Sequence, residues 1–199
     1  MTLKIGVTGG IGSGKSVVTR IFSILDIPVY DADSRAKELM YKDKELKESI
    51  IDTFGPASYT LSGEVNKKYL SSLFSESEEL EKLNKLVHPA VGKDFDHWAE
   101  TMSDEPYIVK EAALMFESGS YRLLDKIIVV CMPEELKIQR LKKRDPFRDE
   151  KQIRDIMKRQ MPEKEKRSMA DYVILNDEKH LLINQVLDLH EQFRASLAR

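Results

Sequence analysis

The sequence has little cysteine and no long apolar stretch. Its one cysteine, Cys131, has no partner for a disulfide within the chain and rules out a zinc site built from several cysteines. This usage is typical of a reducing compartment, and the apolar residues before Cys131 predict a buried strand position. No window approaches the roughly 18 uninterrupted apolar residues of a membrane-spanning helix. The apolar run at the N-terminus is also too short for a secretion signal, so we expect a cytoplasmic protein that does not bind membranes.

The chain also lacks a strong charge of either sign. Its 32 lysines and arginines nearly balance 34 aspartates and glutamates, which gives a formal net charge of −2. Such a balance produces no overall field that would attract nucleic acid or anionic lipid, so we expect neither as a partner. With 199 residues and 41% hydrophobic content, the chain is long enough for one domain with a substantial core.

Short β-branched segments alternate with helical patterns along the chain. This alternation predicts a three-layer α/β fold with a five-stranded parallel sheet and right-handed crossovers. The first helix is expected from about Lys15 to Leu25 and the last after Asp177. The expected strands are Leu3–Val7, Pro28–Tyr30, Tyr107–Val109, Lys126–Met132 and Tyr172–Leu175.

Residues 34–103, between the second and third expected strands, have helical but no strand periodicity. The segment is longer than a crossover between two parallel strands needs to be. We interpret them as a helical lobe inserted into a single domain that spans residues 1–199. Such lobes usually supply the site for a second substrate. The core is then expected at about 1–33, 104–138 and 169–199, with a short helical lid at 139–168.

The segment Gly9–Ser16, GGIGSGKS, matches the pattern G-x-x-x-x-G-K-[ST]. It follows an expected strand and opens an expected helix, so backbone N–H groups from about Gly12 to Ser16 can converge on phosphate oxygens. Lys15 would then meet the β and γ phosphates of ATP, and the Ser16 hydroxyl would complete the shell of a Mg²⁺ ion. A glycine-rich turn without a ligand is the alternative.

A phosphate loop does not by itself distinguish a switch GTPase from a kinase. A switch needs D-x-x-G at the end of a strand and N-K-x-D for guanine. The segment Asp52–Gly55 has the letters of the first but follows a helical pattern, and the segment at Asn84 lacks the aspartate of the second. The sequence therefore favours a small-molecule kinase.

Two aspartates, Asp31 and Asp33, follow the second expected strand. They lie at its C-terminal end, where open α/β sheets bind their ligands. One of them would cap the next helix through its side-chain oxygen, which leaves the other for chemistry. We interpret Asp33 as the catalytic residue that accepts the proton of the acceptor hydroxyl or helps to hold the metal.

Two further carboxylates, Glu111 and Glu117, lie in or just after the third expected strand. A kinase is expected to have a carboxylate there that is linked to Mg²⁺ through water. We prefer Glu117 to Glu111, although a structural role for Glu117 is equally open.

Basic residues outnumber acidic ones between Arg140 and Ser168. Arg140 and Arg144 are four apart, so on a helix they share a face and would reach the same anion. As catalytic residues of a lid they would neutralise charge that develops on the transferred phosphoryl group and exclude water. A solvated helical face is the alternative. We expect the segment RDPFRD to act as a hinge between two lid helices.

Taken together, these segments resemble the dephospho-CoA kinases. The resemblance runs from about Leu3 to His190 and rests, in order, on TGGIGSGKS, YDAD, TFG, LVHPAV, ALMFESG and QRLKKRD. The chain departs from the family at Ala113, where a proline is common, and this affects only the expected conformation of the loop.

The resemblance implies a P-loop kinase fold similar to that of nucleoside monophosphate kinases. It also implies transfer of the ATP γ phosphate to the ribose 3′-hydroxyl of dephospho-CoA, the last step of coenzyme A synthesis. Asp33 would be the base, Lys15, Arg140 and Arg144 would act on the phosphoryl group, and the helical lobe would bind the acceptor. The residues expected to bind ATP phosphates are Gly12, Ser13, Gly14, Lys15, Ser16 and Val17.

His88 falls at the family's His-Pro position. A histidine before a proline at a helix start is otherwise more often structural. With the resemblance, we expect acceptor contacts from Asp33, His88 and Glu117.

Two other functions are open. The protein would be a kinase for a nucleotide or nucleoside, or a non-catalytic ATP-responsive module whose lid closure signals to a partner. A panel of phosphate acceptors separates the three.

Overall fold

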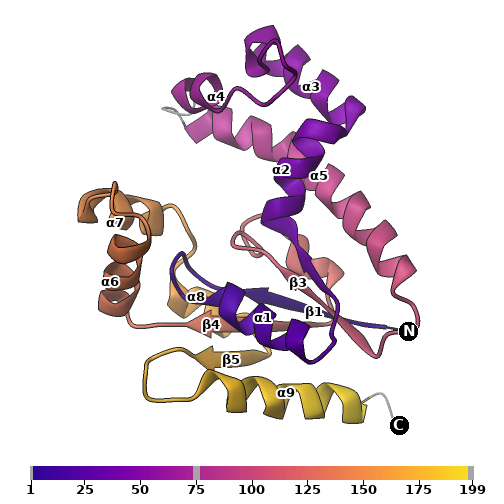
Figure 1. Ribbon diagram of the computed structural model, residues 1–199, viewed down its shortest axis with the longest axis vertical. Coiled ribbons are helices and arrows are strands. Elements are labelled where there is room, and N and C mark those ends of the chain that lie inside the picture. Colours follow the sequence, from indigo (N-terminus) through magenta and orange to yellow (C-terminus); the bar gives the residue numbers. More distant parts are fainter. Residues whose placement is uncertain (1, 74–76, 197–199) are drawn as a thin grey trace. The chain divides into compact units, whose positions relative to one another are not determined.

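The computed structural model describes residues 2–73 and 77–196. The chain divides into two compact units (Figure 1). One is formed by the residues up to Asp31 together with those from Met102 onward, and the other by Ala32–Thr101. Each unit is described below by itself.

The first unit contains a five-stranded parallel sheet with the strand order β2-β3-β1-β4-β5. Most residues of the three central strands are buried, as expected for a parallel sheet covered on both faces. The predicted α/β fold is therefore confirmed. The strands are β1 Leu3–Thr8, β2 Val29–Asp31, β3 Tyr107–Glu111, β4 Lys126–Cys131 and β5 Tyr172–Leu175.

Parallel pairing of the strands brings their C-terminal ends to one edge of the sheet. Val7, two residues before the glycine-rich loop begins, pairs with Glu111 at the end of β3. Asp31 at the end of β2 pairs with the same Glu111. On the other side, Cys131 pairs with Leu175, the last residue of β5. Any ligand at this edge is therefore within reach of several strand ends.

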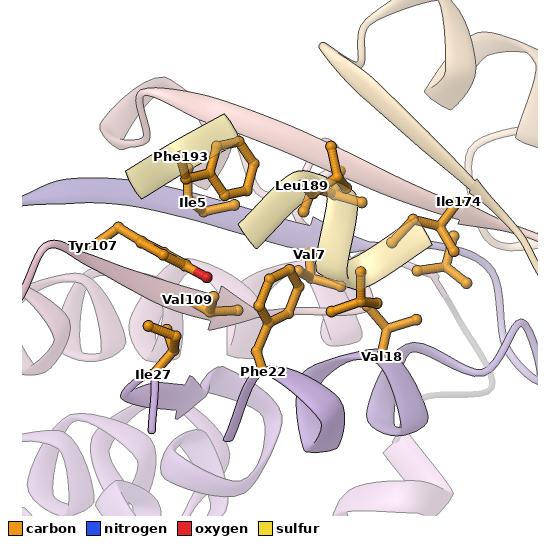
Figure 2. Close-up of a cluster of buried hydrophobic side chains, with 13 residues drawn as sticks. Ile5, Val7, Val18, Phe22, Ile27, Tyr107, Val109, Ile174, Leu189 and Phe193 are labelled. Carbon is orange, nitrogen blue, oxygen red and sulfur yellow. The ribbon is translucent and has the colours of Figure 1, made fainter. Parts of the chain in front are cut away.

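One face of the sheet is covered by α1 (Lys15–Ile24) and α9 (Leu182–Ser196), and each helix buries an apolar face against it. Figure 2 shows side chains from both helices and from the strands gathered in one cluster. The cluster fixes α1, and with it the loop that precedes α1, against the sheet. Its buried members are Ile5, Val7, Val18, Phe22, Ile27, Tyr107, Val109, Ile128, Val130, Ile174, Val186, Leu189 and Phe193.

Three helices lie between β4 and β5: α6 (Glu134–Arg144), α7 (Glu150–Lys158) and α8 (Glu163–Ser168). The expected lid, residues 139–168, begins within α6, and its action as a lid stays a prediction. Ile138 and Leu141 of α6 pack with Ile153 of α7, and Ile11 of the glycine-rich loop lies against them. The segment RDPFRD connects α6 and α7, as predicted. Its action as a hinge stays a prediction. A short 3-10 helix, η2 (Ser120–Leu123), precedes β4.

Cys131 is a buried free cysteine at the end of β4, as predicted. Burial, and the nearby Glu163 carboxylate, raise the pKa of its thiol to about 11. The thiol is therefore unreactive at neutral pH.

The second unit is helical, with α2 (Ala32–Lys42), α3 (Lys44–Phe54), η1 (Pro56–Ser58), α4 (Lys67–Leu73) and α5 (Ser77–Thr101). Arg35 of α2 binds both carboxylate oxygens of Asp94 on α5, with Nε 2.9 Å from Oδ2. The segment Asp52–Gly55 ends α3 and follows no strand, which agrees with the rejection of a switch.

The expectation that Pro89 starts a helix is wrong, because Pro89 lies inside α5. Buried residues continue on one face across the proline, at Leu83, Val87, Val91 and Phe95. Because these residues are four positions apart, they lie on one side of a continuous helix. Burial of this side stabilises the helix and offsets the loss of the backbone hydrogen bond that proline cannot donate.

No helix in the described part of the chain is both long and apolar enough to cross a bilayer.

The imidazole of His190, which contacts the buried Tyr107, makes the stability of the first unit depend on pH. The Tyr107 hydroxyl lies 2.6 Å from His190 Nδ1. Burial, and then the Arg194 charge, lower the pKa of His190 below its ordinary value of 6.5. The unfolded chain therefore binds this proton more readily, and stability that is present above pH 6.5 is lost as the pH falls towards the lower, folded pKa.

We expect the Tm of the wild type to fall more between about pH 7.5 and pH 5.5 than that of His190→Gln. His97→Gln, which alters an exposed histidine of α5, is the control and should follow the wild type. Equal slopes for His190→Gln and the wild type would show that His190 does not titrate in this way.

Candidate functional site

The loop between β1 and α1 holds the ammonium of Lys15 in place. Lys15 is 9% exposed, and its Nζ lies 3.0 Å from the Gly9 carbonyl oxygen and 3.5 Å from that of Gly10. The charge is therefore held against the loop itself. This arrangement suits an anion that is bound by the loop amides and by Lys15 together.

Gly14, the residue before α1, has a left-handed backbone with φ of 93°. A Cβ at this position would lie 2.2 Å from Nδ2 of Asn176. Asn176 is 5% exposed and follows β5 directly, and its Nδ2 donates to the Ser13 carbonyl at 2.9 Å. Sequence reasoning missed Asn176. Its position directly after the last expected strand could have identified it, because parallel strands end on the same side of the sheet as the glycine-rich loop.

Replacing Gly14 by alanine is expected to weaken ATP binding by about 100-fold, because the added methyl group would move Asn176 and the loop out of place. Isothermal titration with ATP measures the change. Gly119→Ala is a matched control, since Gly119 also has a positive φ, of 74°, but a Cβ there meets nothing within 4 Å. It should cost about 1–2 kcal/mol of stability without changing ATP affinity. Unchanged ATP affinity in Gly14→Ala would contradict the role of this loop.

Glu111, rather than the preferred Glu117, lies beside the predicted metal ligand Ser16. The Ser16 hydroxyl donates to Glu111 Oε1 at 3.1 Å, and the Thr19 hydroxyl donates to Oε2 at 2.7 Å. Glu111 is 8% exposed. The pairing of β1 with β3 explains the position, because it brings the end of β3 next to the start of the loop.

Oxygen atoms of Ser16 and Glu111 together fit a Mg²⁺ ion. This ion is usually held by one or two protein ligands, with water and substrate phosphates completing its shell. No group of three or more His, Cys, Asp or Glu side chains suited to a metal occurs among the described residues. The donor set therefore fits a metal that arrives with a nucleotide better than a resident structural metal.

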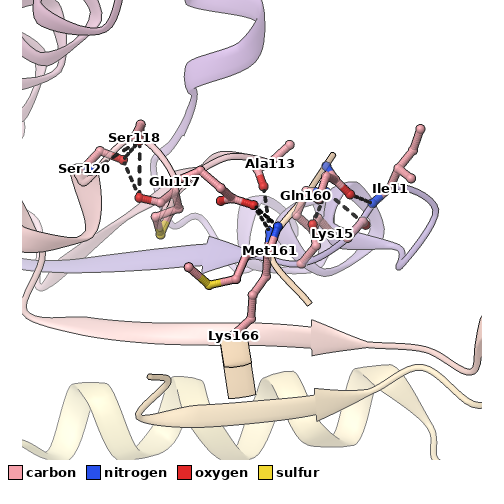
Figure 3. A network of polar contacts seen from close by, with 12 residues as sticks. Ile11, Lys15, Ala113, Glu117, Ser118, Ser120, Gln160, Met161 and Lys166 are labelled. Atoms are coloured by element: carbon pink, nitrogen blue, oxygen red, sulfur yellow. Dashed lines mark hydrogen bonds and ion pairs between the residues drawn. The ribbon is translucent and has the colours of Figure 1, made fainter. Parts of the chain in front are cut away.

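Glu117 joins the segment after β3 to the base of the lid (Figure 3). Its Oε1 accepts from the Met161 N–H at 2.8 Å and lies 2.9 Å from Nζ of Lys166. Lys166 is 1% exposed and also donates to the Ala113 carbonyl at 3.2 Å. These contacts give Glu117 a structural task, and its contact with a substrate stays a prediction.

The two predicted lid arginines lie on α6, as expected, but pair with different carboxylates in this structure. Arg140 Nη2 is 3.3 Å from Glu178 Oε1, in the segment after β5. Arg144 binds Asp145 through Nε and Nη2 at 3.1 and 2.9 Å. The hydrogen bond from Arg144 lowers the pKa of Asp145. That both arginines act on one phosphoryl group stays a prediction.

A cleft of about 490 Å³ lies between the glycine-rich loop and the lid. Gly10 and Ile11 line it from the loop, and Lys137 lines it from α6. The other lining residues are Glu134, Arg154, Met157, Lys158, Gln160, Met161, Pro162 and Glu163.

Two of the three residues predicted to contact the acceptor, Asp33 and His88, belong to the helical unit, whereas Glu117 belongs to the first unit. Asp33 is exposed in the first turn of α2, two residues after Asp31 ends β2. His88 is half-buried on α5, directly before Pro89. Their roles stay predictions.

Known proteins match this chain over most of its length. The model of the dephospho-CoA kinase family matches residues 3–181. A dephospho-CoA kinase of Bacteroides fragilis is 36% identical over 190 residues, covering 95% of this chain and 92% of that protein. One from Bacillus anthracis is 39% identical over 180 residues, covering 89% of this chain and 90% of that protein.

Solved structures share the fold. TT1252 from Thermus thermophilus aligns with a TM-score of 0.77 and 30% identity, covering 99% of this chain and 97% of its own. A dephospho-CoA kinase from Campylobacter jejuni aligns with a TM-score of 0.72 and 24% identity, covering 98% and 99%. The match of the family model runs from β1 through the phosphate loop, the helical unit and the lid, and it makes this chain a member of the dephospho-CoA kinase family.

Proposed function

We propose that this protein transfers the γ phosphate of ATP to the ribose 3′-hydroxyl of dephospho-CoA, giving coenzyme A and ADP. This is the last step of coenzyme A synthesis, and we place it in the cytoplasm. One observation carries the proposal most directly. In a member of the dephospho-CoA kinase family, the Lys15 ammonium lies 3.0 Å from Gly9 O, and the neighbouring Ser16 hydroxyl donates to Glu111 at the end of β3.

The phosphate loop binds and orients the donor. Its amides from Gly12 to Val17 would bind the phosphate oxygens, those of Ser13 and Val17 after giving up their present hydrogen bonds to the Gly10 and Gly14 carbonyls. Lys15 would neutralise charge on the β and γ phosphates. Ser16 and Glu111 would hold Mg²⁺, Ser16 directly and Glu111 through water. The ion would supply positive charge that offsets the charge of the phosphates.

The acceptor hydroxyl loses its proton as the new bond to phosphorus forms. Asp33 accepts this proton as the general base, and the helical unit, with His88, holds dephospho-CoA. Arg140 and Arg144 leave Glu178 and Asp145 to bind the transferred phosphoryl group when the lid closes. The closed lid also excludes water, which would otherwise compete as acceptor.

A panel of acceptors tests the proposal. Purified protein is mixed with ATP, Mg²⁺ and dephospho-CoA, AMP, CMP, adenosine or shikimate, and ADP formation is followed for each. We expect turnover with dephospho-CoA alone. Preference for a nucleoside monophosphate would make the protein a nucleotide kinase, and ATP binding without turnover of any acceptor would favour a binding module.

A further inference from the structure

Gln160, between α7 and α8, joins the base of the lid to the phosphate loop. Its Oε1 accepts a hydrogen bond from the Ile11 N–H at 2.8 Å, although the two residues are 149 positions apart (Figure 3). The residue is half-buried and lines the cleft between loop and lid. None of the steps of the proposed function uses it.

The donor on Ile11 fixes which way the Gln160 carboxamide faces. A main-chain N–H can only donate, so the side-chain oxygen must face Ile11 and Nε2 must occupy the other arm of the amide. No described residue accepts a hydrogen bond from this Nε2. Gln160 therefore offers two N–H bonds to a ligand in the cleft.

The Gln160 side chain lies beside the part of the loop that holds Lys15. The Gly10 carbonyl is one of the two that contact Lys15 Nζ. A Cβ on Gly10 would lie 3.6 Å from Gln160 Oε1 and 3.7 Å from Lys137 Nζ. Because the Lys15 ammonium meets the β and γ phosphates of a bound triphosphate, this is the terminal-phosphate end of the loop.

The surroundings of Gln160 favour an anion. Lys137 is 5% exposed and forms an ion pair with Glu163, whose Oε2 also accepts from the Met132 N–H at 3.4 Å. Arg154 and Lys158 also line the cleft, together with the carboxylates of Glu134 and Glu163, so that three cations face two anions. Arg154 is paired with Glu134. A neutral amide among these cations adds a directional hydrogen bond for a phosphate oxygen.

We propose that Gln160 has two tasks, one for each arm of its amide. Oε1 braces the phosphate loop at Ile11, and Nε2 donates to the terminal phosphate of ATP. ADP lacks this phosphate, so Gln160 discriminates the phosphate donor from the product. The inference rests on the proposed function only in taking ATP as the donor.

Two variants separate the two tasks. Gln160→Glu keeps an oxygen that accepts from Ile11 but removes the donor and adds a charge. Gln160→Met removes both hydrogen bonds without adding a charge. Affinities for ADP and for a non-hydrolysable ATP analogue are measured by calorimetry at fixed Mg²⁺, without an acceptor.

We expect both variants to bind the triphosphate analogue about tenfold or more weakly, because a hydrogen bond to a charged group is lost. ADP affinity should stay within about twofold of the wild type in Gln160→Glu and fall by about threefold in Gln160→Met, which also loses the brace. Gln152→Glu is the matched control: it lies on the same lid, and glutamate keeps its capping hydrogen bond to Asp149, so both affinities should be unchanged.

A wild-type ratio of triphosphate to diphosphate affinity in both Gln160 variants would overturn the contact with the terminal phosphate. An equal loss for both nucleotides also leaves the ratio unchanged, so it would overturn the contact in the same way and leave Gln160 with only its hydrogen bond to Ile11. Where Gln160→Glu does not fold, the ratio in Gln160→Met decides. Because no acceptor takes part, the ratio decides even where the wild type fails to phosphorylate dephospho-CoA, a result that counts only against the proposed function.

Discussion

Replacing Asp33 by asparagine is expected to lower kcat for phosphorylation of dephospho-CoA by a factor of roughly 10²–10⁴, the usual contribution of a general base. Asparagine has nearly the same shape but cannot accept the proton of the ribose hydroxyl. ATP affinity should be unchanged, because Asp33 lies in the helical unit and not on the phosphate loop. Steady-state kinetics and calorimetry with ATP measure the two effects.

Asp31→Asn is the comparison that makes this prediction specific. Asp31 ends β2 beside Glu111 and is the other of the two aspartates at this strand end. The Asp31→Asn variant should retain most of the wild-type activity. Loss of turnover in Asp31→Asn together with normal turnover in Asp33→Asn would assign the base to Asp31 instead.

Replacing Lys15 by methionine is expected to reduce kcat/KM by roughly 10³, as for other groups that stabilise developing charge at a reaction centre. Methionine is similar in length but carries no charge for the β and γ phosphates. Lys15→Arg should not restore activity, since the larger planar guanidinium does not fit the site where a compact ammonium contacts the Gly9 and Gly10 carbonyls.

Lys143→Met is the control for Lys15→Met, because Lys143 is an exposed lysine on α6 and the substitution removes the same charge. It should behave as the wild type. Wild-type kinetics in Lys15→Met would remove the phosphate loop from the mechanism.

The sheet and its two covering helices could be predicted because their signals are local. β-branched segments mark the strands, and residues such as Val18 and Phe22 repeat at helical spacing. The phosphate loop was also readable, since its residues are contiguous. Pro89 misled the prediction because a helix favours proline in its first turn and disfavours it in its interior, whereas here a buried face continues on both sides of the proline.

The support of the phosphate loop could not be read from the sequence, because it comes from distant segments. Glu111 reaches Ser16 across 95 positions, and Asn176 reaches Ser13 across 163. Only the order of strands in the sheet brings them together. The same order could have favoured Glu111 over Glu117, since β3 pairs directly with β1.

The most direct test of the account is the position of the new phosphate. Wild-type protein is incubated with ATP, Mg²⁺ and dephospho-CoA, and the product is analysed by phosphorus NMR. We predict one new phosphate monoester signal coupled to the ribose H3′, with the pyrophosphate signals unchanged. A phosphate on another hydroxyl, or ADP formed only with free inorganic phosphate, would contradict the account.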